Sequence, residues 1–310
     1  MPWSASDVPD LSSRTAIVTG ANSGLGYETA RVLADRGAHV VIACRDLLKG
    51  GVASERIAKE FPAARLELAE LDLASLSSIR SFVESFLGRH SSLHLLCNNA
   101  GVMALPYRQT ADGFEMQLGT NHLGHFALTG LLLERLLATD GARVVTVSSS
   151  MHRIGRILLD DLHGARRYRK WRAYGQSKLA NLLFTYELAR RAERAGGSLV
   201  AAAAHPGYAA TNLQFAGPRM EGSSLMERLS GWGNRLLAQS AAEGALPTLY
   251  AATSPVVRGG DYIGPSSLGE LRGPPRRVGS SRRSLDAEAA AQLWSASEKL
   301  TGVRFDALGG

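Results

Sequence analysis

Cysteine is scarce in this chain: Cys44 and Cys97 are the only two among 310 residues, and each ends an apolar run. Such a low content argues against a disulfide scaffold, so we expect two reduced, buried thiols. Long apolar runs are also missing, since no stretch approaches the roughly 20 residues that a membrane-spanning helix needs. Residues 1–14 have neither the basic nor the apolar region of a signal peptide. These absences predict a cytoplasmic protein without a membrane anchor.

A large block of one charge sign is absent as well. The net charge is +7, but the arginines are dispersed apart from residues 165–172 and the pairs at 276–277 and 282–283. We interpret the excess of positive charge as arginines on a solvated surface, and we predict no nucleic-acid partner. Attraction of anionic ligands is the alternative.

Short apolar runs alternate with segments of helical periodicity along most of the chain. Continuously apolar runs, such as residues 39–44, are typical of strands buried on both faces. The alternation predicts a Rossmann-like, doubly wound parallel sheet of about seven strands, with helices on both faces, in a single domain spanning residues 1–310. The expected strands cover residues 15–19, 39–44, 65–71, 93–97, 142–148, 198–204 and 261–264, and the expected helices cover 24–36, 47–60, 75–90, 113–137, 173–195, 240–252 and 286–301.

Two long connections interrupt this alternation, at residues 151–172 and 207–238. Long connections in a compact domain are usually functional, and open α/β sheets bind ligands beyond the carboxyl ends of their strands, so we expect two substrate loops. The first is basic and irregular; we favour a wall of the substrate pocket over a surface excursion. The second is either a lid over an apolar substrate or a packed flap, and its large apolar residues are Leu213, Phe215, Met220, Leu225, Met226 and Trp232.

The stretch "TGANSGLG" (19–26) joins the first expected strand to the first expected helix. A strand, a glycine-rich turn and a helix start place unpaired N–H groups and a positive dipole end at one point, which suits a phosphate. We expect Gly20 to allow a tight turn, Gly24 to let a pyrophosphate approach, and Gly26 to let the helix pack on the strand. The order G-x-x-x-G-x-G differs from the common G-x-G-x-x-G pattern. In this context it predicts dinucleotide binding.

The second expected strand ends in "IACRD" (42–46). An arginine at this point can accommodate a 2′-phosphate, whereas an acidic residue favours NAD. Arg45 offers a planar donor fork to that phosphate, and we expect Asp46 to cap the next helix. The cofactor is therefore predicted to be NADP(H), with a solvated Arg45 as the alternative.

Seven motifs follow one another in the order of a known family: "TGANSGLG", "LDLAS" (71–75), "NNAG" (98–101), "TNHLGHF" (120–126), "VTVSSS" (145–150), "YGQSK" (174–178) and "HPGYAAT" (205–211). Together they resemble the short-chain dehydrogenase/reductase family over a core of residues 12–265. "ACRD", "SKLANLLF" (177–184) and the long interval before Tyr174 resemble its retinol-dehydrogenase-like branch. Branch members in animals carry an apolar anchor before the first strand, and this chain shows none, so retinoid chemistry is only an analogy.

The resemblance implies catalytic roles. Tyr174 is the general acid/base, and Lys178, one helical turn later, lowers the pKa of that phenol and holds the nicotinamide ribose. Ser149 donates a hydrogen bond to the substrate oxygen; its neighbours Ser148 and Ser150 leave a one-residue ambiguity, which the family's "VSS" pattern resolves toward Ser149. Asn121 holds a water that links the lysine to solvent.

The resemblance also implies the cofactor contacts. The glycine turn holds the diphosphate, the ends of the next strands meet the adenosine, and the "HPGYAAT" motif shapes the nicotinamide pocket. The expected cofactor-binding residues are Gly20, Asn22, Ser23, Gly24, Leu25, Gly26, Arg45, Asp72, Leu73, Asn99, Ala100, Gly101, Tyr174, Lys178, Pro206, Gly207 and Thr211.

Four histidines lie near these motifs, but none belongs to a set with metal-ligand spacing. We expect them to pack or to border the pocket, and we predict no metal. They are His122, His125, His152 and His205.

These expectations combine into an NADP(H)-dependent oxidoreductase that interconverts a carbonyl and an alcohol on an apolar small molecule. A non-catalytic NADP(H) sensor on the same fold is the alternative. The resemblance makes a homo-oligomer possible, with pairing through the helices near 110–137 and 173–195. In the C-terminal extension, 266–310, we favour core packing for Trp294, over closure of the pocket or a dimer contact.

Overall fold

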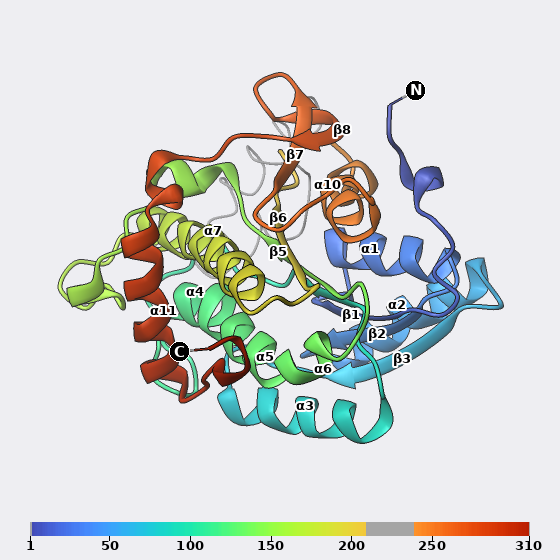
Figure 1. Ribbon diagram of the computed structural model, residues 1–310, viewed down its shortest axis with the longest axis horizontal. Helices are drawn as coiled ribbons and strands as arrows, with labels where there is room; N and C mark the ends of the chain where they lie inside the picture. Colours follow the sequence, from blue (N-terminus) through green and yellow to red (C-terminus); the bar gives the residue numbers. More distant parts are fainter. Residues whose placement is uncertain (1, 209–238, 310) are drawn as a thin grey trace.

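A computed structural model of the chain describes residues 2–208 and 239–309. Its centre is one eight-stranded sheet with the order β3-β2-β1-β4-β5-β6-β7-β8 (Figure 1). All neighbouring strands are parallel except β7 and β8. The strands are β1 (Thr15–Thr19), β2 (His39–Cys44), β3 (Arg65–Glu70), β4 (Leu95–Asn98), β5 (Arg143–Val147), β6 (Val200–Ala204), β7 (Tyr262–Ser267) and β8 (Arg272–Arg277).

Helices cover both faces of the sheet, as Figure 1 shows. Alternate strand residues face the two layers: Ile17 belongs to one buried apolar cluster, and Ala16 and Val18 belong to the other. One layer holds α1 (Gly24–Asp35), α2 (Leu47–Glu60) and α10 (Ala241–Thr253), and the other holds α3 (Leu76–Arg89), α4 (Met116–Leu118), α5 (Gly124–Leu131), α6 (Leu133–Leu137), α7 (Lys170–Arg194) and α11 (Ala287–Thr301).

Polar caps begin two of these helices, and the sequence predicted the one at Asp46. The Asp46 carboxylate accepts a hydrogen bond from the Lys49 backbone N–H at 3.0 Å and caps α2. Ser75 does the same for α3, accepting from the Ser78 N–H at 3.3 Å. Each cap satisfies one of the N–H groups that a helix start leaves unpaired.

The predicted doubly wound sheet is confirmed, with one strand more than expected. The additional strand is β8, which lies in the stretch assigned to the C-terminal extension and pairs antiparallel with β7. It contains Pro274 and Pro275, which lack the N–H that a strand interior donates. Because β8 is at the edge of the sheet, it tolerates them.

The helix expected at 113–137 is interrupted. It consists of α4, a π-helical turn η2 (Gly119–Leu123), α5 and α6. The apolar pattern continues across these breaks, so it did not reveal them. The helix expected at 173–195 begins earlier, at Lys170.

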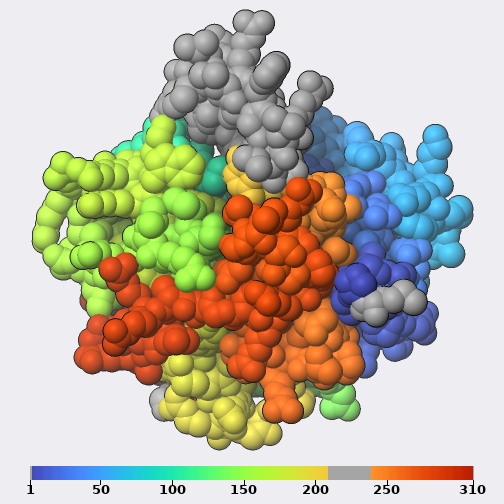
Figure 2. All heavy atoms as spheres, turned by 90° about the horizontal axis from the view of Figure 1, so that it is seen from above, coloured from blue at the N-terminus to red at the C-terminus, as the bar shows by residue number. Residues whose placement is uncertain are grey.

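The 151–172 connection forms two short 3-10 helices, η3 (Ser150–Ile154) and η4 (Leu159–Asp161), before α7 begins. It is tied to the C-terminal part of the chain, since the Arg153 guanidinium lies 3.5 Å from the Glu270 carboxylate. Figure 2 shows this light-green segment next to the orange β7–β8 hairpin. Most of the second expected loop, residues 209–238, lies outside the described residues, and its six large apolar side chains lie there too.

Candidate active site

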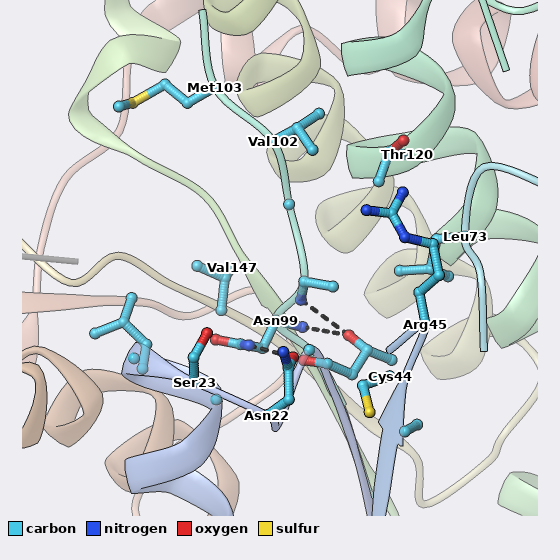
Figure 3. A pocket seen from close by; sticks show the side chains of 18 of the residues that line it. Asn22, Ser23, Cys44, Arg45, Leu73, Asn99, Val102, Met103, Thr120 and Val147 are labelled. Atoms are coloured by element: carbon cyan, nitrogen blue, oxygen red, sulfur yellow. Dashed lines mark hydrogen bonds between the residues drawn. The ribbon is translucent and has the colours of Figure 1, made fainter. Parts of the chain in front are cut away.

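A cavity of about 580 Å³ opens at the carboxyl ends of β1, β2, β4, β5 and β6. The strand order reverses between β1 and β4, and open α/β sheets bind nucleotides at such a switch point. Figure 3 shows side chains from several of these strand ends around the cavity. Its lining includes Ser149 and every predicted cofactor residue among the described ones: Gly20, Asn22, Ser23, Gly24, Leu25, Gly26, Arg45, Asp72, Leu73, Asn99, Ala100, Gly101, Tyr174, Lys178, Pro206 and Gly207. Thr211 lies outside the described residues.

The glycine turn has a geometry that other residues adopt poorly. Gly20 and Gly24 have φ values of 67° and 57°, in the left-handed region that favours glycine. A Cβ on Gly26 would lie 2.4 Å from the Gly20 carbonyl oxygen. Ser23 is the N-cap residue of α1, but its side chain makes no capping hydrogen bond. It therefore leaves the first backbone N–H groups of α1 uncapped. The turn therefore offers a close-approach cradle and helix N–H groups, which fit a diphosphate.

Thr19, at the end of β1, connects the glycine turn to the "NNAG" segment. Its hydroxyl oxygen accepts hydrogen bonds from the backbone N–H groups of Asn99 and Ala100, both at 2.9 Å. The Asn99 side-chain amide in turn donates to the Thr19 carbonyl at 2.8 Å. These reciprocal bonds hold the two strand ends that flank the switch point together.

His125 supports Thr19 from the helix layer. Its Nδ1 donates to the Asn121 carbonyl at 3.0 Å, which leaves Nε2, 2.9 Å from the Thr19 hydroxyl, as the acceptor. Burial lowers the pKa of His125 to about 4 and that of His122 to about 3, so both rings are neutral at pH 7. The Nε2 of His122 lies 3.0 Å from the Ser297 hydroxyl of α11. Both histidines are buried packing residues, as the sequence predicted.

We expect these two histidines to make the fold sensitive to acid. Unfolding restores an ordinary pKa near 6.5, so below that pH the unfolded chain binds protons that the folded chain does not. The two neutral histidines therefore make their full contribution to the free energy of unfolding above pH 6.5, and this contribution declines as the pH falls toward 4. At pH 5.5 each should lower the free energy of unfolding by about 1.4 kcal/mol. Urea unfolding at pH 7.5 and 5.5 measures this, and equal midpoints at the two pH values would contradict it.

The end of the cavity next to β2 carries two cations, Arg45 and Lys49. Arg45 follows β2, is exposed, and extends along the cavity beside Leu73 in Figure 3. Lys49 also lines the cavity, and its ammonium lies 2.7 Å from the Asp46 carboxylate. Sequence reasoning missed Lys49, although its place in the first turn of the helix after Arg45 was a usable signal.

The two catalytic candidates on α7 lie at the other end of the cavity. Tyr174 and Lys178 are both buried, and the ammonium is 5.7 Å from the centre of the phenol ring. Burial raises the pKa of Tyr174 to about 12, and a hydrogen bond with Ser149 opposes the shift. Burial also lowers the pKa of Lys178 to about 8. Burial is thus the largest influence on the pKa of Tyr174 in the protein alone, and its lowering by Lys178 stays a prediction.

Hydrogen bonding distinguishes Ser149 from Ser148, and the role of Ser149 toward a substrate oxygen stays a prediction. Ser148 also borders the cavity, but its hydroxyl donates to the Lys178 backbone carbonyl at 2.8 Å. Ser149 uses its oxygen as an acceptor, from the Met151 N–H at 3.2 Å, and keeps its proton available. Its contact with Tyr174 puts both hydroxyls at one point of the cavity.

Asn121 lies behind the cavity wall rather than on it. It is fully buried in the π-helical turn, and its Oδ1 accepts from the Val102 N–H at 2.7 Å. Its Nδ2 donates to the Val102 carbonyl and to the Ser177 hydroxyl, both at 2.9 Å. The side chain thus ties Val102, which directly follows the "NNAG" segment, to Ser177 of α7. Its water-holding role stays a prediction.

No residue of 151–172 lines the cavity as the described residues form it. Instead, Leu162 joins a buried cluster with Leu179 and Leu183 of α7. Tyr168 donates to the Leu105 carbonyl at 2.8 Å. That the 151–172 connection walls the substrate pocket stays a prediction. The cavity also includes several residues that the sequence analysis did not assign to the site, among them Cys44, Val102, Met103, Thr120 and Val147.

Comparisons with known proteins agree with this geometry. A model of the short chain dehydrogenase family matches residues 14–221. Human retinol dehydrogenase 12 is 44% identical over 299 residues, which cover 96% of this chain and 89% of that protein. Human retinol dehydrogenase 11 is 39% identical over 298 residues, covering 96% and 88%.

Solved structures show the same relationship. The crystal structure of an uncharacterized protein from Mycobacterium Paratuberculosis is 48% identical, has a TM-score of 0.82, and aligns over 98% of this chain and 99% of that one. A short chain dehydrogenase from Shigella flexneri, complexed with NADP, shares the fold at 22% identity, with a TM-score of 0.64 over 83% and 98% of the two chains. This chain is a member of the short-chain dehydrogenase/reductase family of oxidoreductases, in its retinol-dehydrogenase-like branch.

Proposed function

We propose that the protein is an NADP(H)-dependent oxidoreductase that interconverts a carbonyl and an alcohol on an apolar small molecule. The observation that carries this proposal is the presence of Tyr174, Ser149 and Lys178 in the same cavity as the glycine cradle. A phosphate-binding turn and a proton donor in one cavity are what hydride transfer with a dinucleotide requires. Bound NADP(H) would supply the hydride.

The protein's own residues would bind the substrate oxygen and transfer its proton. Ser149 donates a hydrogen bond to the oxygen as negative charge develops on it. Tyr174 delivers its phenolic proton to that oxygen in reduction and removes it in oxidation. Lys178 holds the ribose near the phenol, and its positive charge favours the phenolate as the proton leaves. Asn121 would hold the water through which the lysine exchanges protons with solvent.

Two features support an apolar substrate. Val102, Met103 and Val147 give the cavity an apolar surface. The relatives at 39–44% identity are named for retinol, which is itself an apolar alcohol. The test is a spectrophotometric screen of NADPH and NADH oxidation against apolar aldehydes and ketones. Turnover of none of them, by protein that binds NADPH, would refute the proposal.

The preference for NADP(H) is assigned to Arg45. Replacing Arg45 with alanine should weaken NADPH binding by about 10- to 100-fold, because a hydrogen bond to a charged group contributes about 1.5–3 kcal/mol. NADH, which lacks the 2′-phosphate, should lose little. Fluorescence titration of both cofactors measures the two dissociation constants. Arg304→Ala, at an exposed arginine paired with Asp306, is the control, and equal losses for NADPH and NADH would refute the phosphate role.

A further inference from the structure

One backbone carbonyl anchors the buried ammonium of Lys178. Its Nζ donates to the Val147 oxygen, at the end of β5, over 3.1 Å. The Asn181 side-chain amide donates to the same oxygen over 3.0 Å. Lys178 and Asn181 are three residues apart on α7 and so lie on one face of the helix. Two donors from one helix therefore share a single acceptor.

Sharing the acceptor restricts what the lysine can do. A carbonyl oxygen has two lone pairs, and an ammonium has three N–H donors. Because Asn181 occupies one lone pair of Val147, Lys178 is limited to the other. Its two remaining N–H groups are then available to the cavity, which Lys178 lines. Without the amide, both lone pairs of the Val147 oxygen would be open to the single Lys178 hydrogen bond, and the ammonium would be free to move around that oxygen and away from the cavity.

A buried asparagine at position 181 lowers the stability of the fold. The residue is 1% exposed, and its Oδ1 is buried without a hydrogen-bond partner among the described residues. A buried polar atom without a partner costs about 1–3 kcal/mol, which a leucine here would not incur. His122, whose Nδ1 is also buried without a hydrogen-bond partner among the described residues, interacts with the Asn181 side chain. The hydrogen bond of the Asn181 amide to the Val147 carbonyl offsets part of this cost.

We propose that Asn181 is a positioning residue for Lys178: its amide occupies half of the Val147 acceptor and so directs the ammonium into the cavity. The role rests on the function proposed above, in which Lys178 holds the cofactor ribose and favours the phenolate. Besides Lys178 itself, the titratable groups on the surrounding elements are Tyr174 of α7, His122 of the π-helical turn, whose pKa burial lowers to about 3, and His125 of α5. His125 is neutral across the working pH range, so the tyrosine and the lysine dominate the pH response.

Two substitutions test the proposal by different readouts. In Asn181→Asp the carboxylate would lie within about 6 Å of the ammonium, a range in which an opposite charge shifts a pKa by about 1–3 units, so the pKa of Lys178 should rise. NMR titration of lysine labelled at Cε reports this in the protein alone, with Lys178→Met identifying the signal. Asn181→Leu should lower kcat by about 10- to 100-fold, because it lets a catalytic group drift by about 1 Å.

Thr146→Val is the matched control. Thr146 lies beside Val147 on β5, its hydroxyl is buried without a partner among the described residues, and valine keeps its shape. It should leave the Lys178 titration and the pH profile of kcat unchanged. An unmoved Lys178 titration in Asn181→Asp, or wild-type kcat in Asn181→Leu, would overturn the positioning role. A shifted titration in a protein that reduces no carbonyl would instead leave the positioning intact and refute the proposed function.

Discussion

Replacing Tyr174 with phenylalanine should lower kcat for carbonyl reduction by about 10²- to 10⁴-fold, the usual contribution of general acid catalysis. The substitution removes only the hydroxyl that lies against Ser149. The ring keeps its buried position on α7, so the glycine cradle stays intact and the dissociation constant for NADPH should change little. Steady-state kinetics and fluorescence titration on the same preparations separate the two effects.

Tyr186→Phe is the matched control for this experiment. Tyr186 is also buried on α7, and its hydroxyl lies 2.9 Å from the Ser280 hydroxyl, away from the cavity lining. Its loss should leave kcat near the wild-type value. If wild type and Tyr174→Phe bind NADPH equally and neither turns over any carbonyl or alcohol, the result favours the alternative, a non-catalytic cofactor sensor.

The parts of the site that the sequence predicted are those fixed by local geometry. The glycine turn depends on a few consecutive residues between β1 and α1, and their identities reveal the left-handed φ values at Gly20 and Gly24. Tyr174 and Lys178 face the same way because a helix repeats every 3.6 residues. The position of Asp46 directly before an expected helix predicted the cap that it forms. In each case the residues are close in the sequence, so the local backbone geometry determines how their side chains lie relative to one another.

The parts that were missed depend on the surroundings. Two prolines argue against a strand, and only the edge position of β8 makes them acceptable. The pKa of Tyr174 depends on how deeply α7 is buried, which periodicity does not report. The double use of the Val147 carbonyl by Lys178 and Asn181 requires β5 and α7 to be in contact, and no local pattern encodes that contact.

The C-terminal helix shows how distant packing alters an expectation about assembly. Trp294 of α11 is 2% exposed, as the core-packing prediction required. Its ring centre lies 5.2 Å from that of Phe126 on α5, 5.8 Å from Phe184 on α7 and 4.5 Å from Phe305. The chain therefore covers, with its own α11, part of the α5 and α7 surface through which a homo-oligomer was expected to form. Figure 1 shows α11 lying against this layer.

We expect Trp294→Ala to lower the free energy of unfolding by about 3–5 kcal/mol, because it removes a large buried ring and leaves a cavity among three aromatic neighbours. It also removes the ring over which the Arg191 guanidinium lies at 4.5 Å. Urea unfolding followed by circular dichroism measures the loss.

The control, Trp171→Ala, removes a tryptophan that is 47% exposed and should cost much less. Size-exclusion chromatography with light scattering adds a second readout, since loosening α11 uncovers apolar surface on α5 and α7. An unchanged unfolding midpoint in Trp294→Ala would contradict the stabilising role of the Trp294 ring. A loss of stability together with new self-association would show that α11 occupies a surface that otherwise binds a second copy.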